Sequence, residues 1–153
     1  MFFLDPVAAF ANMGWALRPD GRLVMMVWQG HEQNEWSLAI EEALRGSSVA
    51  PASEVPDPFS LADPARVEGI LDAAGFTDVT FTDVHRPIYY GRDVAEALEW
   101  VRGFTCTKEV IEHSGTASAE RALGRLRTTL AAHAGRDGIW FDSRAWIVKA
   151  RRR

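Results

Sequence analysis

The residues able to do acid–base or nucleophilic chemistry are few in this 153-residue sequence, and their spacing matches no catalytic motif. Its four histidines, His31, His85, His113 and His133, are too scattered for a metal site, so each is interpreted as a solvated or hydrogen-bonded side chain. The single cysteine, Cys106, has no activating base nearby in the sequence and is interpreted as a buried, inert thiol. Catalytic residues therefore stay unassigned, and no metal ligands are expected.

Two further patterns give no site either. Glu41 and Glu42 are adjacent on a predicted helix and point about 100° apart, so they form a solvated face and not a paired-carboxylate site. The glycines fall singly at predicted turns, without a phosphate-binding loop or a dinucleotide fingerprint. The residues alone therefore predict no cofactor site.

Composition narrows the class of protein. A hydrophobic content of 47% and a charged content of 25% are typical of a globular protein, and the length suits a single domain over residues 1–153. The net charge of −4 disfavours nucleic-acid and anionic-membrane partners. A single cysteine excludes an intrachain disulfide, and no apolar run is as long as a membrane span. We expect a cytoplasmic protein without a nucleic-acid or membrane partner.

The elements that must position any site begin with a helix, a turn and a strand. Asp5 and Pro6 are a strong helix start, and apolar residues recur at helical spacing as far as Leu17. The stretch "RPDG" at 18–21 then predicts a turn. Residues 23–28 are apolar without alternation, which predicts a strand buried on both faces, as in a parallel sheet covered by helices.

The rest of the chain continues this mixed pattern. The same signals predict helices over 35–45, 64–74, 94–103 and 119–134, and strands near 79–84 and 145–150. A short helix within 104–117 is left open. The stretch 47–63 is rich in Pro, Ser and Ala and is interpreted as a lid or binding loop. The sequence therefore predicts an α/β protein with about three strands and flanking helices.

The order of these pieces resembles the C-terminal half of class I S-adenosylmethionine-dependent methyltransferases of the small-molecule type. The stretch "ALRPDGRLVMMVW" is similar to the turn and fifth strand of that family, with Asp20 where glycine is usual. "LDAAGFTDVTF" is similar to the joint before its sixth strand. "AWIVKARR" is similar to its seventh strand, which inserts antiparallel between the fifth and sixth.

The resemblance implies half of a Rossmann-like fold, built from strands five, seven and six. In that family S-adenosylmethionine is bound by the first four strands, with a Gly-rich loop after strand one and an acid ending strand two. Neither motif is found in this sequence. We therefore expect no cofactor binding and no activity by this chain alone, and a natural short product, a fragment and a stand-alone descendant stay open as explanations.

The resemblance also implies where a small-molecule substrate would bind. Five residues lie near the entry of the first helix or just after the strand at 23–28, and are predicted to line the substrate mouth: Phe3, Trp28, His31, Asn34 and Trp36. His31 would act as a general base if it faces the pocket, and the alternative is a surface histidine.

A second hypothesis is a non-catalytic ligand-binding or oligomerisation module derived from that fold. Without a fourth strand, the strand over residues 23–28 becomes a sheet edge, and an exposed apolar edge tends to pair with another chain. We therefore expect a homodimer or a higher oligomer. Two copies paired through this edge would form a sheet of about six strands.

Overall fold

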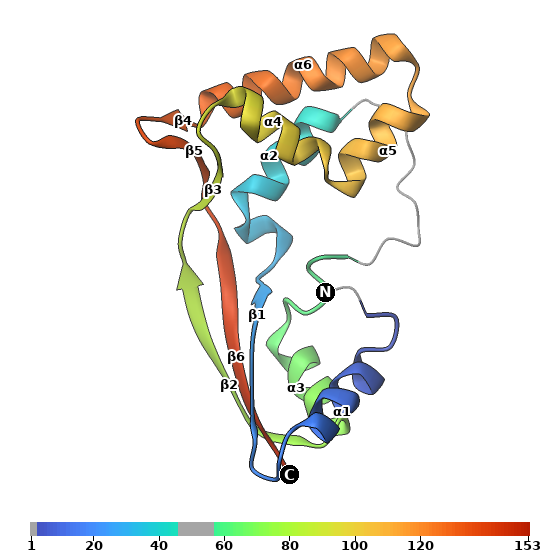
Figure 1. Ribbon diagram of the computed structural model, residues 1–153, viewed down its shortest axis with the longest axis vertical. Coiled ribbons are helices and arrows are strands. Elements are labelled where there is room, and N and C mark those ends of the chain that lie inside the picture. Colours follow the sequence, from blue (N-terminus) through green and yellow to red (C-terminus); the bar gives the residue numbers. More distant parts are fainter. Residues whose placement is uncertain (1–2, 46–56) are drawn as a thin grey trace. The chain divides into compact units, whose positions relative to one another are not determined.

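The computed structural model describes residues 3–45 and 57–153, which form two compact units (Figure 1). Unit 1 contains residues 3–34, 57–85 and 144–153, and unit 2 contains residues 35–45 and 86–143. Each unit is described by itself below. Most of the predicted lid at 47–63 lies outside the described residues.

Unit 1 is a three-stranded sheet with two helices. Its elements are α1 (Pro6–Ala16), β1 (Arg22–Trp28), a short 3-10 helix η1 (His31–Gln33), α3 (Pro64–Ala73), β2 (Phe76–His85) and β6 (Arg144–Arg152). The strand order is β1-β6-β2, and β6 is antiparallel to both neighbours. The predicted position of the last strand, antiparallel between the other two, is confirmed.

Local signals account for the helix starts in unit 1. The Asp5 carboxylate accepts a hydrogen bond from the Ala8 N–H, and the Asp63 carboxylate caps α3 in the same way. A proline follows each cap at the first helical position, as predicted. Asp20 lies in the "RPDG" turn with φ of 59°, a left-handed conformation that glycine adopts more readily.

The prediction that β1 is buried on both faces is wrong. Leu23, Met25 and Val27 pack on the core that α1 and α3 cover, whereas Val24 and Met26 are 58% and 57% exposed. Both helices contribute to this one core, so the other face of the sheet has no helix against it among the described residues. Apolar residues on both faces of β1 therefore do not mean burial on both faces.

Unit 2 is mainly helical, with a small second sheet. Its elements are α2 (Glu35–Leu44), β3 (Ile88–Gly91), α4 (Val94–Arg102), α5 (Thr105–His113), α6 (Thr116–Ala132), β4 (Ala134–Gly135) and β5 (Gly138–Phe141). The strand order is β3-β5-β4, and both pairings are antiparallel. Helix α5 confirms the short helix left open within 104–117, whereas the second sheet was not predicted.

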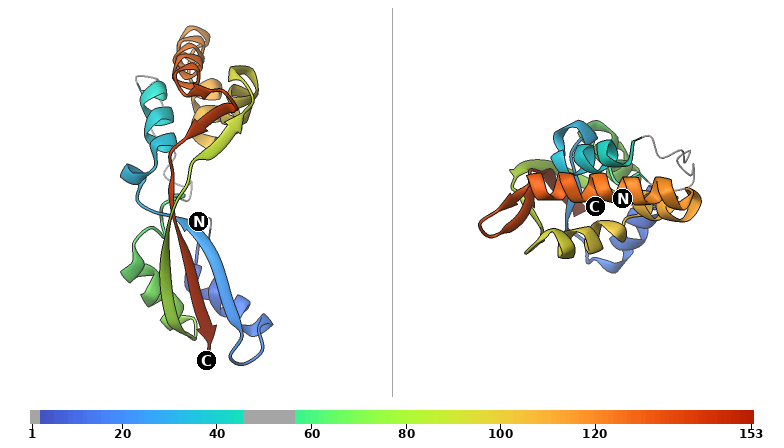
Figure 2. Two further views of the ribbon diagram at one scale, coloured as in Figure 1. Left: turned by 90° about the vertical axis from the view of Figure 1, so that its left-hand side faces the viewer. Right: turned by 90° about the horizontal axis from the view of Figure 1, so that it is seen from above.

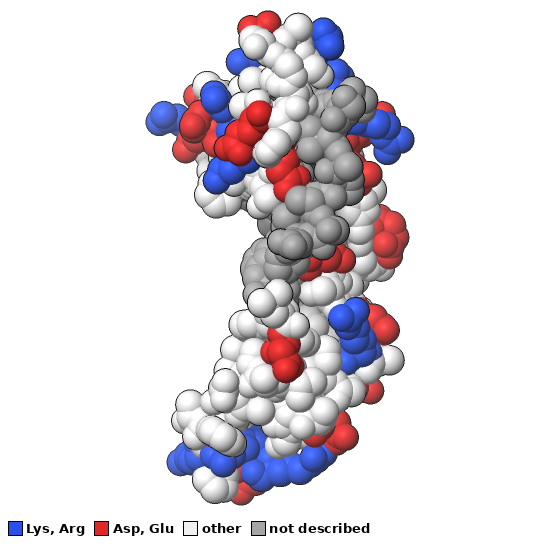
Figure 3. Space-filling view, turned by 90° about the vertical axis from the view of Figure 1, so that its right-hand side faces the viewer, with Lys and Arg blue, Asp and Glu red and all other residues white. Residues whose placement is uncertain are grey.

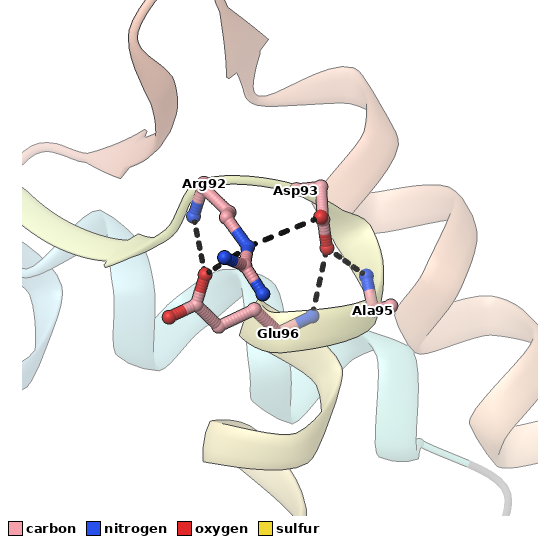
Figure 4. A network of polar contacts seen from close by, with 4 residues as sticks. All are labelled: Arg92, Asp93, Ala95 and Glu96. Atoms are coloured by element: carbon pink, nitrogen blue, oxygen red, sulfur yellow. Dashed lines mark hydrogen bonds and ion pairs between the residues drawn. The ribbon is translucent and has the colours of Figure 1, made fainter.

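The start of α4 shows how this unit uses local capping (Figure 4). The Asp93 carboxylate accepts hydrogen bonds from the N–H groups of Ala95 and Glu96. The Glu96 carboxylate in turn accepts the Arg92 N–H at 3.1 Å and lies 3.2 Å from the Arg92 guanidinium. These charged side chains pair with one another and with backbone N–H groups at the start of α4, so the cluster caps this helix.

No helix among the described residues has the length and apolar character needed to span a membrane.

Candidate functional site

A cluster of polar side chains lies at the end of the unit 1 sheet where β1 finishes and β6 begins. Gln29 follows β1 directly, Asp83 lies near the end of β2, and Arg144 is the first residue of β6. The register pairs Trp28 with Ala145, which brings these positions to one end of the sheet. We call Gln29, Asn34, Asp83 and Arg144 the sheet-end cluster.

Gln29 joins all three strands. Its side-chain amide donates to the Asp83 carboxylate and, at 3.0 Å, to the Ala145 carbonyl oxygen. Its backbone N–H donates to the Arg144 carbonyl oxygen at 3.0 Å. Because Gln29 is only 2% exposed, its amide is shielded from water and depends on these partners. Gln29 therefore holds the end of β1 against β6 and β2.

Asn34 secures the segment that follows. It is fully buried, and its side-chain amide donates to the carbonyl oxygens of Gln29 at 3.2 Å and Gly30 at 3.0 Å. Its side-chain oxygen accepts the Arg144 N–H at 3.1 Å. Asn34 therefore fixes the segment that follows β1, and α2 begins at Glu35 as predicted.

The charged members of the cluster are more accessible. The Arg144 guanidinium lies 3.6 Å from the Asp83 carboxylate, and the two side chains are 39% and 49% exposed. The buried amides thus fix the backbone, and the ion pair between Arg144 and Asp83 stays accessible to water. This ion pair supplies both donors and acceptors at the sheet end.

The predicted site residues Trp28 and His31 belong to the same segment. Trp28 is partly buried at the last position of β1, and His31 opens the 3-10 helix η1. The His31 ring meets Phe59 edge to face, with ring centroids 5.3 Å apart. The structure therefore places Trp28, His31 and Asn34 along one short stretch of the chain, in which Asn34 contacts Arg144.

The other two predicted residues have core contacts. Phe3 packs edge to face on Phe10 of α1, with centroids 5.8 Å apart. Trp36 belongs to unit 2 and meets Phe104, with centroids 6.3 Å apart. Both aromatic side chains thus pack on other aromatic rings, and their predicted place in the substrate mouth stays a prediction.

Sequence reasoning missed Gln29, Asp83 and Arg144. One signal was present, because a polar residue directly after an apolar strand marks the carboxyl end where ligands of open α/β sheets bind. That signal would have found Gln29. Asp83 and Arg144 carry no comparable signal, since their place depends on how β2 and β6 pair.

A second polar group lies in unit 2 around His133. Its Nδ1 is 2.8 Å from the Thr129 carbonyl oxygen, and its Nε2 is 3.1 Å from the Glu35 carboxylate, which also accepts the Asp142 N–H at 2.7 Å. The ring stacks on Phe141 with centroids 4.2 Å apart. Both ring nitrogens have acceptors as partners, so this histidine is a structural link between α2, α6 and β5.

Two groups in unit 2 have raised pKa values. Burial raises the pKa of the Tyr90 phenol above its ordinary value, with a smaller contribution from Cys106. Cys106 is exposed, so the prediction that it is buried is wrong. The surrounding protein nevertheless desolvates its thiol enough to raise the pKa, and the hydrogen bond from Thr107 opposes this only in part. Neither group is poised to ionise near neutral pH.

Within the described residues there is no group of three or more His, Cys, Asp or Glu side chains that could hold a metal ion. No family model matches the chain, and no curated protein matches it either.

Proposed function

We propose that this chain is the C-terminal, substrate-side part of a class I S-adenosylmethionine-dependent methyltransferase that acts on a small molecule. One observation carries the proposal: the last strand, β6, lies antiparallel between β1 and β2. This is the arrangement that the resemblance of the sequence to strands five, seven and six implies.

The turn before β1 supports the same reading. Asp20 stands where the family usually has glycine, and its φ of 59° is a conformation that favours glycine. The position therefore has the backbone requirement of the family's turn, although the residue differs.

The sheet-end cluster is where the substrate would bind. It lies at the carboxyl end of β1, the end at which open α/β sheets hold their ligands. Trp28 and His31 would contact a planar or apolar portion of the substrate, and Asp83 and Arg144 would orient its polar groups. Enzymes of this kind gain much of their rate from such alignment of the methyl acceptor.

The resemblance directs attention to two cofactor motifs, a Gly-rich loop after the first strand and an acid at the end of the second, and neither is found in this sequence. We therefore derive no methyl-transfer step within this chain. Activity would need the cofactor-binding strands that the resemblance places before this part of the fold.

Calorimetric titration of S-adenosylhomocysteine into the purified chain tests the cofactor part. We expect no heat of binding and no thermal shift, and micromolar binding would contradict this expectation. A second titration would use the chain mixed with a polypeptide that supplies the first four strands of a class I methyltransferase. Restored binding in that mixture supports the proposal, and its failure with a folded, associated partner opposes it.

The substrate part is tested by NMR titration of the chain with a panel of planar small molecules that contain O, N or C methyl acceptors. We expect shifts of the Trp28 indole and the His31 ring, and weaker binding to the His31→Ala variant. Trp15 is exposed on α1 and provides the control, because Trp15→Phe should leave binding unchanged. Binding that ignores His31→Ala would place the substrate elsewhere.

A second candidate function is the oligomerisation module. One observation favours it: among the described residues β1 pairs with a single strand, β6.

A further inference from the structure

The ion pair of the sheet-end cluster is not closed into a hydrogen bond. The Nη1 atom of the Arg144 guanidinium lies 3.6 Å from Oδ2 of the Asp83 carboxylate. A charge-assisted hydrogen bond between such groups joins atoms about 2.7–2.9 Å apart. The other carboxylate oxygen of Asp83, Oδ1, accepts a hydrogen bond from the buried Gln29 amide. Asp83 Oδ2 and the Arg144 N–H groups therefore keep the capacity to bond to a further molecule.

The backbone beneath both charged side chains is held in place. The Arg144 N–H donates to the Asn34 side chain at 3.1 Å, and the Arg144 carbonyl oxygen accepts the Gln29 N–H at 3.0 Å. Asp83 lies within the paired part of β2, and Figure 2 (left) shows β6 between β1 and β2. A ligand would thus meet a donor and an acceptor whose positions are set by the sheet.

An aromatic ring belongs to the same face of the sheet as the ion pair. Trp146 lies opposite Asp83 in the antiparallel register and two positions after Arg144 in β6. Side chains in directly opposite positions have Cβ atoms about 4.5–5.5 Å apart. The Trp146 indole N–H already donates to the Ala62 carbonyl oxygen at 3.1 Å, and the ring is partly buried against Phe81. The accessible part of this ring therefore offers an apolar contact.

The charges at this end of the sheet favour a neutral ligand. Asp83 and Arg144 carry opposite charges, and the side of unit 1 that carries α1 and α3 is largely uncharged (Figure 3). A carboxylate bound to Arg144 would lie beside the Asp83 carboxylate, and an ammonium group bound to Asp83 would lie beside the Arg144 guanidinium. Each would meet a like charge at short range, which is unfavourable.

We propose that the sheet-end cluster binds the amide edge of a neutral, planar molecule. The ligand N–H donates to Asp83 Oδ2, the ligand carbonyl oxygen accepts from the Arg144 guanidinium, and the ligand ring packs against Trp146. Carboxamides, lactams and ureides have such an edge, because each places an N–H beside a C=O. This inference rests on the proposed function, for which it names the class of substrate.

A matched series of naphthalene ligands, all substituted at the same ring position, tests this chemistry with the full chain. Naphthamide offers the amide edge, naphthoate only a carboxylate, and naphthylmethylammonium only a cation. N,N-dimethylnaphthamide keeps the carbonyl oxygen without an N–H. Calorimetric titration near neutral pH should give naphthamide a dissociation constant at least about tenfold below the other three. Each of those ligands lacks a charge-assisted hydrogen bond or meets a like charge.

Asp83→Asn separates recognition from folding because it should change the order of the ligands. Removal of the negative charge should weaken naphthamide binding about tenfold and strengthen naphthoate binding about tenfold, since the carboxylate no longer meets a like charge. A general loss of structure would weaken both. Arg144→Gln is the complementary variant, and it should strengthen naphthylmethylammonium binding while it weakens naphthamide binding.

Asp78→Asn is the matched control. Asp78 lies on the same strand as Asp83, and its carboxylate is 4.0 Å from the Arg151 guanidinium in another exposed ion pair between β2 and β6. Asparagine tolerates the left-handed φ of 53° found at Asp78. The Asp78→Asn variant should keep all four dissociation constants of the unchanged chain.

NMR locates the bound ligand. Naphthamide should shift the signals of the Trp146 indole N–H and the Arg144 side chain. The indole signal of Trp15, which is exposed on α1, should stay unchanged and serves as the reference.

Three results would overturn the proposal. The first is naphthoate or naphthylmethylammonium binding as tightly as naphthamide. The second is naphthamide binding that neither Asp83→Asn nor Arg144→Gln changes, and the third is no naphthamide binding at millimolar concentration. Failed cofactor titrations with naphthamide binding intact would oppose the methyltransferase proposal alone. Failure of the amide series with restored cofactor binding would overturn only this class of substrate.

Discussion

Replacing Asn34 is the sharpest test of how the sheet-end cluster works. The side chain is fully buried; its amide group donates to the carbonyl oxygens of Gln29 and Gly30, and its oxygen accepts the Arg144 N–H. Asn34→Ala removes these three hydrogen bonds and leaves the carbonyl oxygens of Gln29 and Gly30 and the Arg144 N–H without this partner. Asn34→Asp keeps the shape and the acceptor but replaces the donating amide group with an oxygen.

The magnitudes follow from these contacts. Each hydrogen bond contributes about 1 kcal/mol, so Asn34→Ala should lower the free energy of unfolding by about 3 kcal/mol. The aspartate variant keeps only the bond to the Arg144 N–H and directs a buried negative charge at two carbonyl oxygens. We expect it to be destabilised at least as much at neutral pH.

The pH dependence distinguishes the two variants. Burial among carbonyl oxygens should raise the pKa of the carboxyl group that Asn34→Asp introduces above its unfolded value of about 3.9. A raised pKa in the folded state means that protonation favours folding. The aspartate variant should therefore regain stability relative to the alanine variant as the pH falls towards about 4.

Urea unfolding, followed by circular dichroism and by hydrogen exchange of the β6 amides, measures these differences. Asn12→Asp is the matched control, because Asn12 is exposed on α1 and its substitution should change the free energy of unfolding by less than about 0.5 kcal/mol. If Asn34→Asp were as stable as the control at neutral pH, the donor role of the Asn34 amide would be refuted.

Three further predictions concern one turn and one buried phenol. Asp20→Gly should raise the free energy of unfolding by up to about 1 kcal/mol, because glycine adopts the observed φ of 59° with less strain. A destabilised Asp20→Gly variant would contradict this account of the turn. In the same turn Gly21→Ala should lower the free energy of unfolding by about 1–3 kcal/mol, since the new Cβ would lie 2.6 Å from the Arg18 carbonyl oxygen and 2.9 Å from the Leu17 Cβ. Burial raises the pKa of Tyr90, so only the unfolded chain ionises readily near pH 10, and the free energy of unfolding should fall as the pH rises above about 10. The urea midpoint should fall less steeply with pH between about pH 8 and pH 11 in the Tyr90→Phe variant than in the unchanged chain. Equal slopes in the two proteins would argue against this role of the Tyr90 phenol.

The helix starts could be predicted from the sequence because their causes are local. Asp5, Asp63 and Asp93 each cap a helix through N–H groups two or three residues further along the chain. The position of the last strand, between the other two, followed from a resemblance over several stretches, and the observed strand order agrees with it. The described residues form two compact units, and the single domain expected over residues 1–153 stays a prediction.

The sheet-end cluster and the open face of β1 were decided by tertiary structure. Gln29 donates to Asp83 and Ala145, which are 54 and 116 residues away, and Asn34 accepts from Arg144, which is 110 residues away. No local pattern contains such pairings, because they depend on the register of β6 against β1 and β2. The sequence alone determined that β1 is an apolar strand after a tight turn. Only the placement of α1 and α3 on the same side of the sheet decided which of its two apolar faces is buried.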